Sequence, residues 1–466
     1  MTRAASTRRL SSAHRAVLAT CAALLWGTAL AQTPTPTPTP TSTAASMPAL
    51  TLAQYLSQVE TGNLDLQSQR EASNAARAAV SVAGVSPDPQ LTVGVASREL
   101  YAPNRVNAAT PLTAGVAFTF ETAGKRSARI ASAQSNVALT EALLGAAHDQ
   151  LLIDASAAFV EACRSREVRA RKQLTLASLQ ATVRANETRL RVGDIGALEL
   201  RQSRIEAQRA GLDVSNASAD AETARINLAL PLGQALDGAS NGATPPVGLD
   251  CGFAAPTEIV AASLDLDTFV SQALARRRDV GAAQAGVVNA RDGVNLARSN
   301  RWVDPVVNVG LTNTPRIPAR LDASGATTNS PTALRSLTLG LTLTLPIPLS
   351  RLQNGELRQA EVALTQAQLG LNSVALKAQA DVRATHARFR AVANNERIYR
   401  DELAKESERV LEAARFSYRK GASSLLELLN AQRTADQIAL DHLQALADLA
   451  NATVRLQINA GLRPQL

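Results

Sequence analysis

Histidine, cysteine and carboxylate side chains are the groups in this chain that could do chemistry, and their spacing limits what they could do. Apart from His14 near the N-terminus, the histidines are His148, His386 and His442, and they are scattered along the sequence. None belongs to a His-x-x-x-His or Cys/His cluster, and no nucleophile motif or phosphate-binding loop is present in the sequence. We therefore expect no enzyme activity, no metal site and no cofactor.

Two cysteines, Cys163 and Cys251, lie in segments of different character. Cys163 falls within a long helix-forming stretch, and Cys251 falls in a Gly/Pro-rich linker. In an oxidising compartment they could pair and pin the linker to the helix, or they could remain two isolated thiols. Spacing alone does not decide between these alternatives.

Two carboxylates, Glu199 and Glu427, follow glycine-containing turns at matching places. Gly193 matches Gly421, and Leu198-Glu199-Leu200 matches Leu426-Glu427-Leu428. An acid in the first turn of a helix is favoured by the helix dipole, so both residues have a structural reason to be there. That reason does not exclude a further role.

The N-terminus reads as a secretory signal over residues 1–31. Four arginines precede the apolar run Ala16–Leu30, which is too short to span a membrane, and a small-x-small cleavage site ends at Ala31. Cys21 lies inside the apolar run after Thr20, which does not fit a lipidation motif. Residues 32–49 are a Thr/Pro-rich tether of extended type.

The charge balance argues against a nucleic-acid partner. Loss of the leader removes four arginines and no acid, so the net charge falls from +8 to +4. The remaining charges are interleaved, with no block of one sign.

Two long stretches, Arg126–Arg191 and Leu352–Lys420, contain no proline and almost no glycine. They are rich in Ala, Leu, Gln, Glu and Arg, so we expect two helical rods of about 100 Å each. Such rods are too polar to cross a bilayer and need partner helices. The predicted partners are Leu50–Glu60, Leu64–Val85, Ala197–Leu230, Leu266–Arg276, Asp279–Asn300 and Ser424–Ala460.

Four short segments alternate apolar with small or polar residues, which is the period of a β-strand. These strands are Gln90–Ala96, Leu112–Glu121, Val307–Thr312 and Leu337–Leu345. One face is apolar, and the other suits a water-filled lumen with Thr92, Gly94, Thr119, Asn308 and Thr342. Four strands are too few to close a barrel, since the smallest have about eight, and open edges are not tolerated in lipid. We therefore expect several copies to share one barrel, although strand periodicity alone also allows a half-buried soluble sheet.

The order of helices, strands, rod and return helix occurs twice. The first repeat covers residues 50–233, an equatorial linker covers 234–265, and the second repeat covers 266–462. The matching tip turns and strand glycines predict an internal duplication.

Taken together, these features resemble the TolC-like outer membrane factor family over Leu50–Leu462. The chain is similar to its cobalt–zinc–cadmium efflux branch in the run Glu121–Arg126 after the second strand and Leu345–Leu349 after the fourth. The tip residues that carry the resemblance are Tyr418, Gly421, Leu426, Glu427 and Leu429.

The resemblance implies a mostly α fold with a β contribution. A trimeric outer-membrane β-barrel would continue into a periplasmic α-helical barrel. It also implies a homotrimer in outer-membrane lipid, a periplasmic adaptor, and an inner-membrane pump reached through that adaptor. The function expected is a passive duct for a tripartite efflux system of the RND type, for heavy-metal cations, with drug efflux or type I secretion as alternatives. A soluble periplasmic coiled-coil adaptor is the alternative from another class.

By position, the resemblance places a gate and a docking surface at the tip. Glu427 would line the constriction, and Glu199 would face Tyr418 across the coils. Asn430 stands where a second acid is common, and Ser423 stands where an arginine link can occur. The expected adaptor-docking residues are Gly193, Asp194, Ile195, Leu198, Gly421, Ser423, Leu425 and Leu426.

Overall fold

The structure is a computed structural model of the 466-residue chain. It describes residues 50–95, 111–233, 249–252, 266–316, 321, 323–326, 335–347 and 354–464. The predicted leader, the tether and most of the linker lie outside the described residues.

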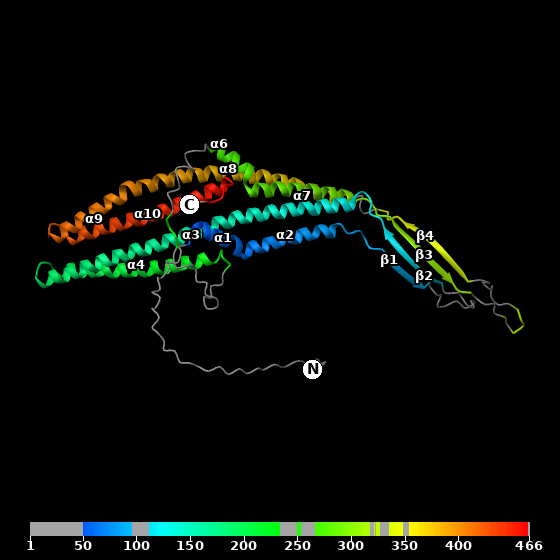
Figure 1. The fold of residues 1–466 in the computed structure, drawn as a ribbon, viewed down its shortest axis with the longest axis horizontal. Coiled ribbons are helices and arrows are strands. Elements are labelled where there is room, and N and C mark those ends of the chain that lie inside the picture. The colour runs from blue at the N-terminus through cyan, green and yellow to red at the C-terminus, as the bar shows by residue number, and fades with distance from the viewer. Residues whose placement is uncertain are drawn as a thin grey trace, which may run out of the picture. The chain divides into compact units, whose positions relative to one another are not determined.

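Helices make up most of the described chain (Figure 1). In the first half they are α1 (Leu52–Gly62), α2 (Leu64–Ala83), α3 (Lys125–Arg191) and α4 (Ala197–Ala229). In the second half they are α6 (Leu266–Arg276), α7 (Arg278–Asn300), α8 (Gly355–Ile398), α9 (Ala404–Arg419) and α10 (Leu425–Asn459). Each predicted helix is present, with ends that shift by up to three residues. Among the described helices, none combines the length and the apolar composition needed to cross a membrane.

Side-chain caps explain where several of these helices begin. Thr51 and Gln54 form a reciprocal capping box at α1. Asn63 ends α1 and caps α2 by accepting from the Leu66 amide at 2.8 Å. These caps satisfy amide groups that have no partner within the helix.

The second rod differs from its expectation in one respect. It is not one continuous α-helix, because the π-helical turn η2 (Tyr399–Leu403) separates α8 from α9. The first rod is uninterrupted over its 67 residues. Helix propensity did not reveal this difference, because good helix formers do not distinguish an i+4 from an i+5 hydrogen bond.

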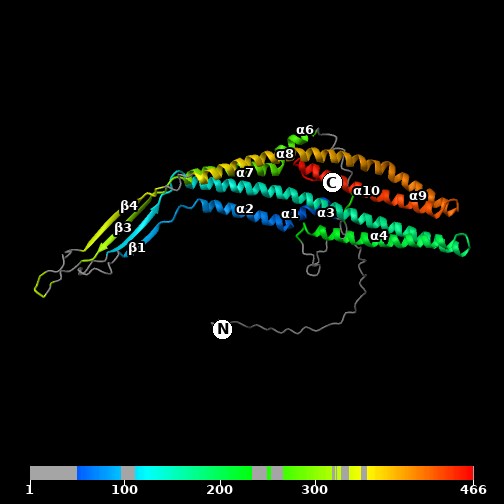
Figure 2. The ribbon, with the colours of Figure 1, turned by 180° about the vertical axis from the view of Figure 1, so that it is seen from behind.

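Each rod changes partners along its length (Figure 2). The part of α3 near the sheet packs against α2 and α7, and its far part packs against α4 and α10. The second rod packs on α6, α7 and α10 through α8, and on α10 through α9. The short helices therefore follow one another along the rods, as the repeat pattern predicts.

The sheet has four antiparallel strands in the order β1-β2-β3-β4. They are β1 (Gln90–Val95), β2 (Leu112–Thr119), β3 (Val306–Thr314) and β4 (Ser336–Thr344). The central pair, β2 and β3, joins the first half of the chain to the second. Within the described chain, β1 and β4 are edge strands, each paired on one side only.

The largest apolar core lies where α1, α3, α4 and α10 meet. It includes Tyr55, Phe159, Leu228 and Val454, and the linker residues Leu249 and Cys251 pack against it. The Tyr55 hydroxyl donates to the Leu228 carbonyl at 3.0 Å, so its polar end is satisfied inside the core. This core fixes the first half of the chain against the last helix of the second half.

Candidate functional site

The strand register sorts the residues of the sheet into two faces. Paired residues in an antiparallel sheet point to the same side. Thr92, Gly115, Gly310 and Gly340 form one row across all four strands. The neighbouring row contains Gln90, Ala117, Asn308 and Thr342. Gly94 pairs with Thr113, and Thr119 pairs with Val306, so all five residues predicted for the lumen share one face.

The opposite face is apolar and exposed. Its rows contain Leu91, Val93, Val95, Leu112, Ala114, Val116, Phe118, Val307, Val309, Leu311, Leu337, Leu339, Leu341 and Leu343, with Asn313 as the one polar residue among them. Leu341 is 74% exposed, and all nine residues of β4 are exposed. A contiguous apolar sheet face of this kind marks contact with lipid or protein.

An ion-paired cluster joins the sheet to the rods. Lys125, only 5% exposed, extends its Nζ to within 2.6 Å of Asp304 Oδ2, just before β3. The Thr122 amide donates to Asp304 Oδ1 at 2.9 Å. Burial by itself would raise the pKa of Asp304, but the hydrogen bonds from Lys125 and Thr122 outweigh it and hold that pKa below its ordinary value.

Next to this cluster, Arg129 pairs with Glu121. The same guanidinium donates to the carbonyls of Ala83 and Val85 at the end of α2. The run Glu121–Arg126, which carried part of the family resemblance, thus lies in the joint between the strands and both halves of the helical part.

At the other end of the rods, the two tip turns have the same backbone hydrogen bonds. Gly193 and Gly421 adopt left-handed φ values of 78° and 73°. The backbone amide of the residue after each glycine donates a hydrogen bond to the carbonyl five residues earlier, and the distance is 2.9 Å in both turns. This is the hydrogen bond of a Schellman motif, which ends a helix. A left-handed residue is required at this place, which explains the matching glycines.

The predicted gate carboxylates begin the return helices. Glu427 is exposed and forms a capping box with Ser424, in which each side chain accepts the other residue's amide proton. Glu199 is half-buried in the first turn of α4, and Asn430 is exposed on α10. Both acids therefore lie in the first turn of a helix, where the dipole favours them, and Glu427 also forms a capping box, whereas the N-cap of α4 makes no side-chain hydrogen bond. Glu427 and Asn430 remain exposed.

Tyr418 ties the two tip hairpins together. Its hydroxyl donates to Asn186 Oδ1 of α3 at 2.7 Å, and the Arg189 guanidinium lies 5.0 Å from the centre of its ring. Burial raises the pKa of Tyr418, the contacts with Asn186 and Arg189 oppose that, and the charge of Glu199 adds to the rise. The direct hydrogen-bond partner of Tyr418 is Asn186.

A polar ladder crosses between the hairpins further from the tip. Arg415 of α9 donates to Ser178 of α3 and to Gln432 of α10, both at 2.8 Å. Gln432 donates to Asp436 at 3.0 Å, and Arg171 of α3 pairs with Asp436 at 3.0 Å. Grooves of about 400 Å³ lie on either side of this ladder. The two hairpins are therefore joined here by polar contacts that lie beside the apolar cluster of Leu179, Leu411 and Leu429.

The residues predicted for adaptor docking differ in exposure. Gly193, Asp194, Gly421 and Leu426 are exposed, as is Leu198. Ile195 and Ser423 are half-buried. Leu425 departs from the expectation, because it is only 3% exposed and packs in the apolar cluster of Leu179, Leu411 and Tyr418. Leu425 therefore supports the turn from inside and is not part of an outer surface.

The linker is covalently held to the first rod. Cys163 and Cys251 form a disulfide in the structure, with Cα atoms 5.6 Å apart. Leu249 forms an isolated parallel β-bridge with Leu50. The Leu249 carbonyl also accepts a hydrogen bond from the Arg166 guanidinium at 2.8 Å. The pairing that the sequence left open is thus present, and it closes a loop that contains the tip turn and α4.

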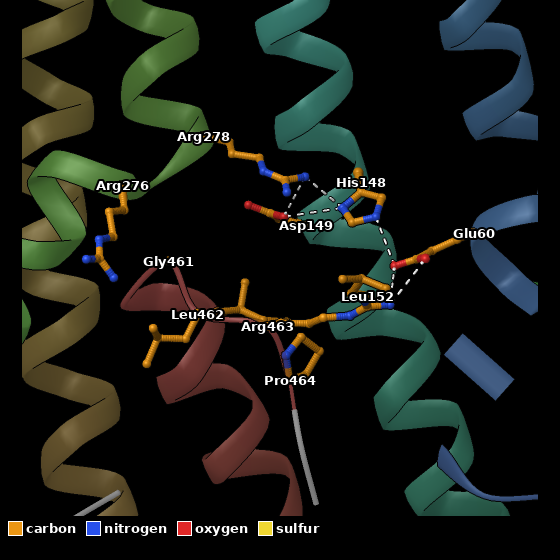
Figure 3. Close-up of a pocket in the computed structure, with 11 residues that line it drawn as sticks. Glu60, His148, Asp149, Leu152, Arg276, Arg278, Gly461, Leu462, Arg463 and Pro464 are labelled. Carbon is orange, nitrogen blue, oxygen red and sulfur yellow. Dashed lines mark hydrogen bonds and ion pairs between the residues drawn. The ribbon is translucent and has the colours of Figure 1, made fainter. Parts of the chain in front are cut away.

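A charged cavity of about 310 Å³ lies beside the largest core (Figure 3). His148 lies between Glu60, at 3.2 Å from Nε2, and Arg278, at 2.9 Å from Nδ1. Arg278 also pairs with Asp149 at 3.2 Å, and Arg463 approaches Glu60 at 3.5 Å. Figure 3 shows that these groups come from α1, α3, α7 and the segment after α10. The network thus connects the two halves of the chain. In the described part of the chain, no group of three His, Cys, Asp or Glu side chains could hold a metal ion.

Sequence reasoning missed Asn186 and Glu396. Asn186 is fully buried at 0% exposure, at the position where the Leu176, Leu179, Val183 spacing calls for an apolar residue. A polar residue on an apolar seam was therefore the signal that could have found it. Glu396 is also buried, and it pairs with Arg400 at 3.2 Å, beside the π-helical turn.

The chain belongs to the outer membrane efflux protein family, because the model of that family matches residues 55–234 and 269–461. A comparison with characterised protein sequences finds no significant match. Several solved structures share the fold. A membrane protein from Pseudomonas aeruginosa is 21% identical, with a TM-score of 0.66 over 88% of this chain and 92% of that one. The outer membrane channel CmeC of Campylobacter jejuni is 15% identical, with a TM-score of 0.69 over 89% and 87% of the two chains.

CusC is 18% identical, with a TM-score of 0.66 over 88% of this chain and 92% of that chain. Family membership identifies the chain as an outer-membrane efflux channel component whose helical part lies in the periplasm. It is a transport protein and not an enzyme, and the alternative of a soluble coiled-coil adaptor is set aside. Proteins of this family work with periplasmic adaptors and inner-membrane pumps.

Proposed function

We propose that three copies of this chain close one β-barrel in the outer membrane, with each copy giving four strands. The observation that carries the proposal is the sheet, which has two unpaired edges among the described residues and one exposed apolar face. β1 and β4 run antiparallel when they meet between copies, because the four strands alternate in direction. Pairing them would satisfy the edge amide and carbonyl groups that lipid cannot satisfy.

The helices support the same assembly, because the outer helices carry exposed apolar stripes. On α4 the stripe is Ile205 and Leu212, spaced by seven residues, and it begins one such interval after Leu198 of the tip. On α8 it is Val362, Leu369 and Leu376, with the same spacing. A seven-residue apolar repeat is the pattern of a helix that packs in a coiled coil, so each stripe fits a helix of a neighbouring copy. The helices would then form a periplasmic tube continuous with the barrel.

The lumen of the barrel in this proposal is the face with Thr92, Gly94, Thr119, Asn308 and Thr342. The side chain of Asn308 lies over Gly115 on this face. A Cβ added at Gly115 would stand 2.8 Å from Asn308 Oδ1. The apolar face would contact lipid, which matches its composition.

The gate in this proposal is the tip. Glu427 would line the constriction with Asn430 beside it, and Tyr418 would hold the second hairpin to the first through Asn186. Glu199, in the first turn of α4, would face Tyr418 across the coils. The arginine link absent at Ser423 is replaced here by the ladder from Ser178 to Arg171. An adaptor would open the tip by docking on the exposed turn residues Gly193, Asp194, Leu198, Gly421 and Leu426.

The substrate we propose is a heavy-metal cation delivered by an RND-type inner-membrane pump through the adaptor. The support is the likeness of Glu121–Arg126 and Leu345–Leu349 to the cobalt–zinc–cadmium branch. Export of drugs or type I secretion of proteins are the alternatives that the same duct would serve.

The internal duplication is supported by the matching tip turns. The backbone amides of Asp194 and Ala422 each donate a hydrogen bond to the carbonyl five residues back.

The proposal is tested by fractionation and by conductance. Membrane fractions extracted with detergent should contain the protein, and the purified protein should insert into planar bilayers as a low-conductance channel. Glu427→Ala should raise its open conductance, and Asn430→Ala at the next turn should raise it less, because it removes no charge. Recovery of the chain from the periplasm without detergent would refute the duct, and equal conductance for wild type and Glu427→Ala would refute the gate residue.

A further inference from the structure

Three consecutive arginines, Arg276, Arg277 and Arg278, lie where α6 ends and α7 begins. Arg277 pairs with carboxylates on α7 and α8, and Arg278 reaches across to pair with Asp149 of α3. Arg276 lines the charged cavity of Figure 3, yet it has no ion pair or side-chain hydrogen bond among the described residues. The cavity therefore has a guanidinium whose charge is not neutralised within the described chain.

The other charged groups around the cavity cancel one another. Arg278 can only donate, so its 2.9 Å contact makes His148 Nδ1 an acceptor and leaves the Nε2 proton to be donated to Glu60. The imidazole is neutral in this arrangement. Arg278 and Arg463 then balance the two carboxylates of the lining, Glu60 and Asp149. With three arginines against two carboxylates, the lining has an excess of one positive charge.

Two glycines make room for the arginines of this cavity. Gly145 is the one glycine of α3, and glycine weakens a helix relative to alanine. A Cβ added at Gly145 would stand 3.0 Å from Arg278 Cδ. A Cβ added at Gly461, which has a left-handed φ of 74°, would stand 2.6 Å from Arg276 Cβ. The backbone on both sides of the cavity is thus adapted to the approach of an arginine side chain.

Apolar side chains complete the lining. Leu152 and Ile458 are buried, and Leu462 is half-buried. The volume of about 310 Å³ is several times the roughly 30 Å³ that one water molecule occupies in the liquid. Arg276 and Arg463 are exposed, so the cavity is open to solvent on their side. It has room for an anionic group together with several carbon atoms.

From these observations we infer that the cavity binds a small organic oxyanion of the periplasm, a carboxylate or a phosphate ester. The planar guanidinium fork matches the oxygen atoms of both groups. The anionic group pairs with Arg276 and Arg463, and the carbon atoms contact Leu152, Ile458 and Leu462. The whole site belongs to one chain, so it does not depend on how copies share a barrel. Its lining comes from both halves of the chain, so a bound anion stabilises the contact between them.

The inference is tested by isothermal titration of the detergent-extracted, full-length protein. The probes are sodium succinate and sodium glycerol phosphate, and sodium chloride at the same ionic strength is the reference. Arg276→Gln removes the excess charge without breaking an ion pair of the described chain, and Arg463→Gln is a second, independent variant. Arg390→Gln is the matched control, because Arg390 is exposed on α8 and lies outside the lining.

Wild type should bind at least one probe above the chloride reference, and the preferred probe identifies the anionic group. Arg276→Gln should weaken that binding by roughly tenfold or more, because a charge-assisted hydrogen bond is lost. Arg463→Gln should weaken it as well, and Arg390→Gln should bind like wild type. The inference is overturned if wild type binds neither probe, if Arg276→Gln binds as tightly as wild type, or if Arg390→Gln weakens binding as much as Arg276→Gln.

Discussion

The Tyr418 hydroxyl donates a 2.7 Å hydrogen bond to Asn186 Oδ1 and so joins α9 to α3 near the tip. Both side chains are buried, at 6% and 0% exposure. The bond connects two hairpins that face each other across polar grooves further from the tip. A buried hydrogen bond of this kind fixes one arrangement of the two hairpins over its alternatives.

Tyr418→Phe should therefore loosen the closed tip. The change leaves Asn186 Oδ1 buried without its donor, which costs about 1–3 kcal/mol. We expect more frequent openings of the reconstituted channel in single-channel recordings. Tyr399→Phe is the matched control, because Tyr399 lies in η2 and is only half-buried. Identical opening frequencies for Tyr418→Phe and wild type would remove Tyr418 from the gate.

Asp436→Asn should weaken the ladder between the hairpins. Asp436 and Arg171 are mostly shielded from solvent, so loss of the charge pair leaves Arg171 poorly compensated. We expect a loss of about 1–3 kcal/mol, seen as a lower thermal midpoint in detergent.

Glu406→Gln provides the comparison for that variant. It breaks an exposed pair with Arg409 on α9, and exposed pairs contribute little. A thermal midpoint for Asp436→Asn as high as that of Glu406→Gln would mean that the ladder does not stabilise the hairpin contact.

The joint between strands and rods should be acid-sensitive. The pKa of Asp304 is lower in the folded chain than its ordinary value, so its stabilising effect is present above about pH 4. That effect is lost as the pH falls through the lowered pKa. We expect wild type to lose stability on acidification below about pH 4, and Asp304→Asn to lose less over the same interval.

Urea unfolding of the two proteins at a series of pH values measures this difference. Asp304→Asn should be the less stable protein at neutral pH, and the gap should narrow in acid. A gap that stays constant from neutral pH into acid would contradict the role given to the Lys125 pair.

The Cys163–Cys251 disulfide should stabilise the first hairpin. It closes a loop of 88 residues in sequence separation, which includes the tip turn and α4. Cys163→Ser should cost about 2–4 kcal/mol, because the unfolded chain regains the freedom that the loop removes. Reductant should lower the thermal midpoint of wild type toward that of the variant and leave the variant unchanged. A wild-type midpoint that does not respond to reductant would show that the bond does not contribute.

Sequence patterns predicted the elements of this fold well because their periods are long and regular. The rods, the return helices and the four strands follow from helix propensity, from alternation and from the glycine turns, and only the ends shift. The π-helical turn at Tyr399–Leu403 was not predictable, because no local propensity separates it from an α-helix. Leu425 was assigned to the surface although it is buried, because a turn sequence does not show which residues pack inward.

The tip was predictable in position but not in contacts. The matching turns pointed to Glu199 and Glu427, and the family resemblance pointed to Tyr418, yet the partner of Tyr418 proved to be Asn186. Asn186 lies far from Tyr418 in sequence, and only the packing of α3 against the second hairpin brings them together. The disulfide required the same kind of knowledge, because the distance between two thiols depends on tertiary structure.

The central claim is that copies of this chain share one barrel, and the mass of the detergent-extracted complex tests it most directly. Native mass spectrometry should give three times the mass of the mature chain, in a particle that resists dissociation until its β-structure melts. A particle with the mass of one chain, with its β-sheet intact and no need of detergent, would contradict the account.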